Sequence, residues 1–228
     1  MGTRVRGKRH RADAEKVTDK PLSVADAIKV LRSFKPVKFD PMVELVVWLG
    51  IAPKQADQAV RGAIALPHGI GKSKRVVAFC EGEAVTAAKA AGAIEAGLDD
   101  LVKKVQDGWT DFDVAVATPN VMRVVSRLGR ILGPTGKMPS PKAGTVVDDI
   151  ATAVREYSAG KIEYRNDDGG NVHVPVGKLS FDDTRLIENI EAFLTRLRQA
   201  KPATSKGTYF KRTTLKTTMS PGVAVDVQ

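Results

Sequence analysis

The segment closest to a catalytic motif is HGIGKS, residues 68–73, in which two glycines precede a lysine and a serine. In a phosphate-binding loop, backbone amides and such a lysine would cradle phosphate groups. That loop also requires a glycine five residues before Gly71, where Leu66 stands, and a later apolar strand that ends in a metal-binding aspartate. Because both features are missing, we interpret Pro67 and Gly69 as part of a hinge between domains and not as a nucleotide-hydrolysis site.

The other reactive side chains are few and widely spaced. Cys80, the only cysteine, ends the apolar run VVAFC, so we expect a buried and inert thiol. His10, His68 and His173 lie too far apart to form a zinc motif. His173 stands between Val172 and Val174 in an extended segment and is expected to point away from the apolar side. We therefore predict no catalytic residue, no metal and no cofactor.

The charge of the chain indicates a polyanionic partner. The sequence holds 36 Lys plus Arg and 26 Asp plus Glu, a net charge of +10. Residues 70–160 carry 12 basic and 11 acidic residues, a net of +1, whereas the two flanks carry 24 and 15, a net of +9. Residues 196–218 include seven basic residues and no acidic one. The flanks are thus predicted to form an electrostatic footprint, the alternative being a tail whose charge only maintains solubility.

A long segment from Gly129 to Lys142 is rich in glycine, proline and lysine. Loops of this length in a compact domain are usually functional or disordered. Arg130, Lys137 and Lys142 are candidates for a secondary contact with phosphate groups of a polyanion, and the alternative is a rigid surface loop with solvated charges.

The elements that would position these residues form two groups. In the middle of the chain, strand-like and helix-like segments alternate, which is typical of parallel pairing in a small doubly wound, Rossmann-like α/β domain. The expected strands are residues 76–80 and 113–118, and the expected helices are 83–91, 98–106, a segment that starts at Pro119, and 148–157.

The flanks have a different pattern. We expect helices at 23–34, 53–59 and 183–199, and extended segments at 42–49, 60–66, 161–166, 171–176, 208–217 and 223–227. Asp167-Asp168-Gly169-Gly170 is a strong hairpin turn. Because neither flank looks self-sufficient, we predict that residues 1–69 and 161–228 form one split α+β outer domain, with residues 70–160 inserted as the α/β domain.

No segment looks capable of crossing a membrane. The longest apolar stretch, residues 42–53, contains Glu44 and falls well short of the roughly 20 residues that a membrane helix needs. The basic N-terminus lacks an apolar run typical of a secretory signal. We therefore expect a cytoplasmic protein without a membrane partner.

Several motifs together resemble the bacterial large-subunit ribosomal protein L-one family. In chain order they are ADQAVRG (56–62), LPHGIGK (66–72), DFDVAVATP (111–119), LGRILGPTGKMPSPKAGTV (128–146) and KTTMSPGV (216–223). The resemblance covers essentially the whole chain, and the segment 128–146 is its most specific part.

The resemblance implies a structural protein that binds large-subunit ribosomal RNA at the mobile side stalk. It also implies a part in the exit of deacylated transfer RNA and repression of translation of the protein's own messenger RNA. In that family the split outer domain is the main RNA binder, and the inserted domain moves about a two-strand hinge. We assign Pro67, Gly69 and Gly160 to this hinge, and we expect a monomer when the protein is off the ribosome.

Carried over onto this chain, the resemblance implies a main RNA-binding surface at two places and a second patch. The main surface comprises Lys38, Phe39 and Glu44 together with Thr217, Thr218, Met219 and Ser220, and the second patch comprises His173, Pro175, Gly177 and Lys178. Lysines would neutralise phosphates, while hydroxyls, backbone groups and flat apolar side chains would read the shape and 2′-hydroxyls of a structured RNA.

The sequence departs from the family pattern at four positions. Met42 stands where a small hydroxyl residue is usual, and Ser220 stands where a glycine is usual; Thr135 and Ser140 replace an arginine and an asparagine in the loop. Two alternative functions stay open. One is an enzyme built on the inserted domain, with Cys80, Thr118 and Asn120 at the strand ends. The other is a non-ribosomal adaptor that binds its partners through the flanks.

Overall fold

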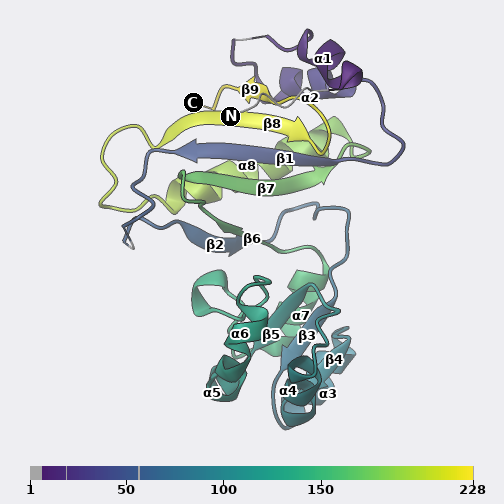
Figure 1. The fold of residues 1–228 in the computed structure, drawn as a ribbon, viewed down its shortest axis with the longest axis vertical. Helices are drawn as coiled ribbons and strands as arrows, with labels where there is room; N and C mark the ends of the chain where they lie inside the picture. The colour runs from purple at the N-terminus through teal and green to yellow at the C-terminus, as the bar shows by residue number, and fades with distance from the viewer. Residues whose placement is uncertain (1–6, 19, 56, 228) are drawn as a thin grey trace. The chain divides into compact units, whose positions relative to one another are not determined.

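The computed structural model describes residues 7–18, 20–55 and 57–227 (Figure 1). The chain is a mixed α/β protein that divides into two compact units. The outer unit comprises Met1–Val60, Leu66–Gly71 and Tyr164–Gln228, and the inserted unit comprises Arg61–Ala65 and Lys72–Glu163. The inserted unit thus includes residues 61–65 and 161–163, which the sequence placed in the outer domain, while residues 70 and 71 belong to the outer unit. The domain boundaries at 69/70 and 160/161 stay a prediction.

A four-stranded sheet in the order β7-β1-β8-β9 forms the centre of the outer unit. Its strands are β1 (Met42–Leu49), β7 (Asn171–Lys178), β8 (Phe210–Thr217) and β9 (Val223–Val225). β1 pairs antiparallel with both β7 and β8, and β8 pairs antiparallel with β9. The turn at 167–170 leads directly into β7. Of the hairpin that the sequence predicted here, the structure forms only an isolated antiparallel bridge between Asn166 and Val172, because the preceding strand, Ile162–Arg165, belongs to a different sheet.

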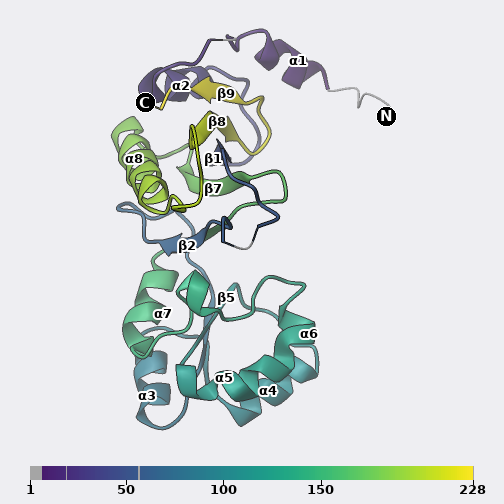
Figure 2. The ribbon, with the colours of Figure 1, turned by 90° about the vertical axis from the view of Figure 1, so that its left-hand side faces the viewer.

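One face of this sheet is buried, because α8 (Asp183–Gln199) and α2 (Val24–Arg32) pack against it (Figure 2). Val43, Leu45, Val47 and Leu49 are fully buried. Since side chains alternate along a strand, the residues between them, Met42, Glu44, Val46 and Trp48, lie on the opposite, open face.

The helices of the outer unit follow from local sequence. The Ser23 side chain accepts a hydrogen bond from the Asp26 N–H and caps α2, which lies within the helix expected at 23–34. The helix expected at 183–199 is α8, and its apolar stripe is buried. The sequence did not predict α1 (Lys8–Ala14), and its prediction of a helix at residues 53–59 was wrong. Around the undescribed residue 56, this segment forms turns and bends instead.

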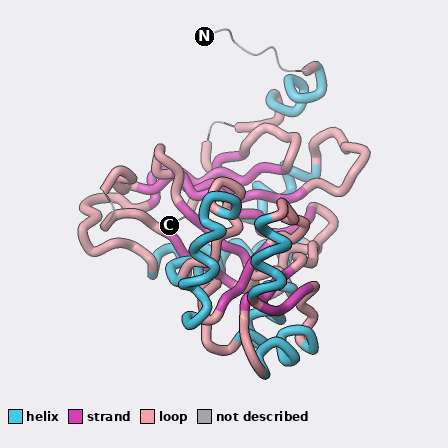
Figure 3. Tube along the Cα trace, turned by 60° about the horizontal axis from the view of Figure 1, so that its bottom comes forward, coloured by secondary structure: helices cyan, strands magenta, loops and turns pink. Residues whose placement is uncertain are grey.

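The inserted unit contains a parallel sheet in the order β4-β3-β5. Its strands are β3 (Val76–Phe79), β4 (Glu95–Gly97) and β5 (Val114–Ala117); the short strand β4 was not predicted. The parallel pairing agrees with the alternation of strands and helices in the sequence. Figure 3 shows helices in cyan and strands in magenta along the Cα trace.

Helices cover both faces of this parallel sheet (Figure 2). Val76 and Ala78 point toward α3 (Glu83–Ala90) and α7 (Ile150–Ser158). Val77 and Phe79 point toward α4 (Asp99–Gln106), α5 (Met122–Val125) and α6 (Gly129–Leu132). β3 and β5 therefore each supply alternate side chains to two separate hydrophobic cores.

The segment that starts at Pro119 is less regular than one helix. It consists of 3-10 turns at Pro119–Val121 and Ser126–Leu128, with α5 between them and α6 after them. The loop expected at 129–142 therefore begins as the helix α6, and another 3-10 turn follows at Pro141–Ala143. Elsewhere, β2 (Arg61–Ile64) and β6 (Ile162–Arg165) form a two-stranded sheet. None of the helices in the described part of the chain is long and apolar enough to cross a membrane.

Candidate nucleic-acid interface

The start of β1 and the turn after β8 lie side by side. Val43 is opposite Thr217 in the antiparallel pair, which brings the segment before β1 next to the turn at 217–221. The Met42 N–H donates to Thr218 Oγ1 over 3.1 Å, and the Thr218 N–H donates to the Met42 carbonyl over 3.0 Å. These two bonds extend the β1–β8 ladder by one step and hold the two segments together.

Phe39 and Met219 are the exposed apolar residues of these two segments. Each is 52% exposed, and the described residues include only two other large hydrophobic side chains classed as exposed, Trp48 and Ile94. Exposed aromatic and thioether side chains offer flat, adaptable surfaces to nucleotides. Lys38, next to Phe39, is also exposed. Two residues predicted from distant parts of the sequence are thus brought to the same end of one sheet.

The hydroxyl of Ser220 belongs to the turn itself. Its Oγ accepts from the Thr217 N–H over 2.9 Å and donates to the Pro221 carbonyl over 2.9 Å. Among the described residues only glycines have a positive φ, so Ser220 does not need a conformation that favours glycine. Thr217 is 6% exposed and offers little surface for a ligand, whereas Thr218 is exposed.

The open face of the sheet carries part of the second predicted patch. Pro175 is opposite Glu44, and His173 is opposite Val46. The His173 side chain is 56% exposed, as its position in the strand predicted, and its Nε2 lies 3.6 Å from Asp167 Oδ2. Glu44 is not a free carboxylate, because Lys216 Nζ lies 2.7 Å from its Oε2. A ligand on this face would therefore meet a neutralised Glu44.

The other two residues of that patch are placed differently. Gly177 is buried, and a Cβ atom there would lie 2.9 Å from Leu186 Cδ2, on the side of the sheet that α8 covers. Glycine at this position therefore serves the close packing of β7 on α8. Lys178 Nζ lies 3.9 Å from Asp40 Oδ2, near the start of β1.

A carboxylate shapes the turn before His173. The N–H groups of Asn171 and Gly169 donate to Asp167 Oδ1 over 2.7 and 2.9 Å. The bonds from Asn171 are the largest cause that lowers the pKa of Asp167 below its ordinary value. This carboxylate stays charged at neutral pH and fixes the loop from which β7 starts.

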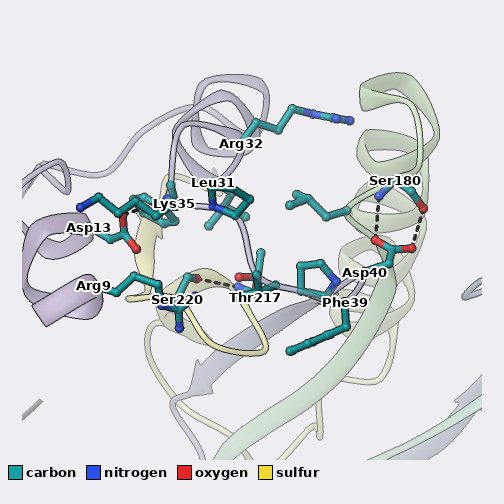
Figure 4. A pocket seen from close by; sticks show the side chains of 15 residues that line it. Arg9, Asp13, Leu31, Arg32, Lys35, Phe39, Asp40, Ser180, Thr217 and Ser220 are labelled. Atoms are coloured by element: carbon teal, nitrogen blue, oxygen red, sulfur yellow. Dashed lines mark hydrogen bonds between the residues drawn. The ribbon is translucent and has the colours of Figure 1, made fainter. Parts of the chain in front are cut away.

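A hollow of about 340 Å³ lies next to Phe39 and the turn that carries Met219. Figure 4 shows Ser220 and Thr217 on one side of it and Asp40 and Ser180 on the other. The Ser180 N–H and Oγ–H donate to Asp40 over 3.3 and 2.7 Å, and Arg9 Nη2 donates to the Met219 carbonyl over 3.0 Å. Basic and acidic side chains both line the hollow: Arg9, Arg32, Lys35, Asp13 and Asp40. The helix α1 therefore contributes to the surroundings of the candidate interface.

The basic residues of the loop in the inserted unit have different surroundings. Lys137 Nζ donates to the Thr110 carbonyl over 2.9 Å and lies 5.3 Å from the centroid of the Phe112 ring. This lysine therefore stabilises the fold of the unit. Arg130 and Lys142 are exposed and remain candidates for a phosphate contact.

Cys80 lies at the carboxyl end of β3, at the strand ends of the inserted unit. Cys80 is fully buried, as predicted, and burial raises the pKa of its thiol above the ordinary value. Within the part of the chain that the structure describes, no group of three or more His, Cys, Asp or Glu could hold a metal ion.

A residue that the sequence did not single out, Asn189, is hydrogen-bonded to the predicted hinge segment. Asn189 on α8 is fully buried. Its Oδ1 accepts from the His68 N–H over 3.1 Å, and its Nδ2 donates to the carbonyls of Gly69 and Val176 over 3.0 and 2.8 Å. Gly69 has φ of 61°, and Gly160 after α7 has φ of 109°, both favourable to glycine. Asn189 thus anchors the 66–71 segment within the outer unit.

The charge excess lies in the outer unit. Counted from the sequence, the outer unit carries 22 Lys plus Arg and 14 Asp plus Glu, a net of +8. The inserted unit carries 14 and 12, a net of +2. The unit with the exposed Phe39 and Met219 side chains is therefore also the unit suited to a polyanion.

Residues 31–221 match the model of the ribosomal protein L1p/L10e family. The matched range begins within α2, contains the whole inserted unit, and ends in the turn after β8.

Proposed function

Because the chain belongs to the ribosomal protein L1p/L10e family of ribosomal proteins that bind ribosomal RNA, we propose that its outer unit binds large-subunit RNA at the mobile side stalk. The proposed contact surface is the end of the sheet where Phe39 and Met219 lie. One observation carries this assignment: two half-exposed apolar side chains lie on adjacent segments of the more basic unit.

The chemistry of this surface suits a folded RNA. Phe39 and Met219 pack against unstacked bases or riboses, and Lys38 neutralises a phosphate nearby. The exposed Thr218 and the backbone groups of the turn meet sugar 2′-hydroxyls. His173, Pro175 and Lys178 extend the surface over β7, and Arg130 and Lys142 supply a weaker contact from the inserted unit. The protein acts by positioning RNA and catalyses no reaction.

The resemblance of the sequence motifs to the bacterial branch supports the finer parts of the proposal. The protein takes part in the exit of deacylated transfer RNA and represses translation of its own messenger RNA, whose leader mimics the ribosomal site. The two compact units act as a split outer domain and an inserted domain, which moves about a hinge at Pro67, Gly69 and Gly160. Off the ribosome the protein is a cytoplasmic monomer.

Competition binding at several salt concentrations tests the proposal. The purified protein is titrated with a stalk-type ribosomal RNA fragment and with an unrelated RNA of equal length. Non-specific binding loses affinity steeply as salt rises, whereas specific contacts leave a gap between the two RNAs at high salt. We expect that gap to persist. Equal and steeply salt-dependent binding to both RNAs would mean that the outer unit is only a polyanion patch.

A second measurement tests repression of the protein's own messenger RNA separately from ribosomal RNA binding. The leader of the protein's own messenger RNA should compete with the stalk fragment for one site. If the leader fails to displace the fragment, repression by mimicry is wrong while ribosomal RNA binding stands.

A further inference from the structure

Trp48 is an exposed aromatic residue at the far end of β1 from Phe39. It is 44% exposed. It lies six residues after Met42, which corresponds to about 20 Å along an extended strand. Trp48 shares the open face of the sheet with Glu44 and Val46, so it is not part of the core between the sheet and α8.

The surroundings of this indole are cationic. Lys211 Nζ lies 4.8 Å from the centroid of the Trp48 ring, and Arg212 is opposite Trp48 in the β1–β8 register. Both are exposed, and within the described residues neither forms an ion pair. A hollow of about 550 Å³ lies here, and Asp226 is the one carboxylate among its described lining residues. An anion is therefore favoured next to an exposed aromatic ring.

We propose that Trp48, Lys211 and Arg212 form a stacking platform for an unpaired nucleotide of the RNA that the outer unit binds. The base stacks on the indole, and the two cations contact the phosphates on either side of it. This inference rests on the proposed function and adds a second contact to it.

Two observations favour a nucleotide over other occupants. The platform combines an aromatic ring with two cations that form no ion pair among the described residues. This combination binds single-stranded nucleic acid. It also continues the open sheet face that carries His173 and Lys216, so one RNA can follow the face from the Phe39 end. An acidic peptide would use the cations without needing the ring.

Tryptophan fluorescence tests the platform directly. The only other tryptophan, Trp109, packs against the core of the inserted unit, 5.5 Å from Phe112 in ring centroids. In a Trp109→Phe variant, Trp48 is the sole indole reporter. Titration with the stalk RNA fragment should quench its emission, saturating at the RNA concentration at which labelled RNA anisotropy saturates. A fragment whose unpaired bases are replaced by paired ones should bind with less quenching.

Affinity measurements provide the second arm. Trp48→Ala should weaken RNA binding by about 5- to 100-fold, the range expected for one stacked base, whereas Trp48→Phe should retain most of the affinity. Lys211→Gln and Arg212→Gln should each lower the salt slope by about one, while Lys89→Gln, on α3 of the inserted unit, should leave it unchanged.

The outcomes separate this inference from the proposed function. If the RNA binds tightly while Trp48 emission is unchanged and Trp48→Ala binds like the wild type, the platform is wrong and the proposed function stands. If the stalk RNA shows no specific binding at all, the proposed function and the platform both fail.

Discussion

At the level of single residues, exposed side chains allow an effect on RNA binding to be separated from an effect on folding stability. Phe39 and Met219 are each 52% exposed, so truncating them removes little buried surface. We expect Phe39→Ala or Met219→Ala to weaken binding of the stalk RNA by about 1 to 3 kcal/mol, with little change in the melting temperature. RNA anisotropy and thermal unfolding of the same preparations measure the two effects.

Ile94 provides a matched control for this prediction. It is 48% exposed, but it lies in the inserted unit and outside the candidate interface. Ile94→Ala should leave RNA affinity unchanged. Wild-type affinity in both Phe39→Ala and Met219→Ala would contradict the site assignment, and an equal loss in all three variants would indicate a general effect on folding.

The departure at Ser220 also has a residue-scale explanation. The side chain folds back and bonds to Thr217 and Pro221, so it stabilises the turn instead of pointing away from it. Serine in place of the usual glycine at position 220 therefore requires no backbone conformation that only glycine favours. For Met42, the structure shows that its backbone N–H and carbonyl both bond to Thr218, contacts that any side chain at this position permits.

At the level of elements, Asn189 joins three segments of the outer unit. Replacing it with leucine would leave the His68 N–H and the carbonyls of Gly69 and Val176 without their partner. Because buried polar groups without partners are costly, we expect Asn189→Leu to lower the free energy of unfolding by about 2 to 4 kcal/mol. Urea unfolding followed by Trp48 fluorescence in the Trp109→Phe background reports on this unit.

Glu191, on the same helix, is the control for Asn189. It is exposed, so Glu191→Ala should change the free energy of unfolding by less than about 0.5 kcal/mol. An Asn189→Leu variant as stable as this control would mean that the hydrogen bonds at Asn189 do not hold the 66–71 segment.

The elements predicted from the sequence are those with a strong local pattern. The alternation in β1, the apolar stripe of α8 and the cap at Ser23 each specify their structure locally. The three-residue strand β4 and the short helix α1 have no such pattern, because neighbouring elements supply most of the stability of short segments. The prediction of a helix at 53–59 was wrong for the same reason, because a helical pattern in so short a segment does not by itself stabilise a helix.

The candidate site was predictable only in part. The positions of Phe39 and Met219 came from the family resemblance, and the antiparallel register that brings them together needed the structure. Two signals in the sequence could have shown more. Trp48 alternates in phase with Glu44, which places it on the open face, and Asn189 is a polar residue within the apolar stripe of α8.

At the level of the whole molecule, all three tyrosines are buried. Burial raises the pKa of Tyr209 to about 12, and it raises the pKa values of Tyr157 and Tyr164 above the ordinary value near 10. As pH rises above about 10, the unfolded chain loses these protons first. The stability that depends on these protonated phenols is therefore fully present below about pH 10, and it is lost as pH rises toward the pKa values of the folded state.

Phenolate absorbance and far-ultraviolet circular dichroism against pH measure this effect. We expect little phenolate near pH 10 in the folded protein, followed by phenolate formation together with loss of structure. Tyr209→Phe should not lower stability at pH 7, because its buried hydroxyl has no hydrogen-bond partner in the described part of the chain. Three phenols that titrate near pH 10 in a fully folded protein would contradict the prediction.

The division of charge between the units gives a prediction for the intact molecule and its parts. The outer unit has a net charge of +8 and holds the Phe39 and Met219 surface, whereas the inserted unit has +2. Replacing residues 72–163 with a flexible linker should therefore keep affinity for the stalk RNA within about tenfold and preserve most of the salt slope, since few phosphate contacts are lost. The isolated segment 72–163 should bind the same RNA weakly and without specificity.

Filter binding at several salt concentrations, with circular dichroism to establish folding, measures both fragments. Phe39→Ala in the linker variant should weaken binding by the same factor as in the full chain, because both carry the same interface. If the folded linker variant loses specific binding, or the isolated inserted segment retains it, the RNA site does not lie where charge and exposed apolar surface coincide. The contacts of Arg130 and Lys142 would then have to supply most of the affinity.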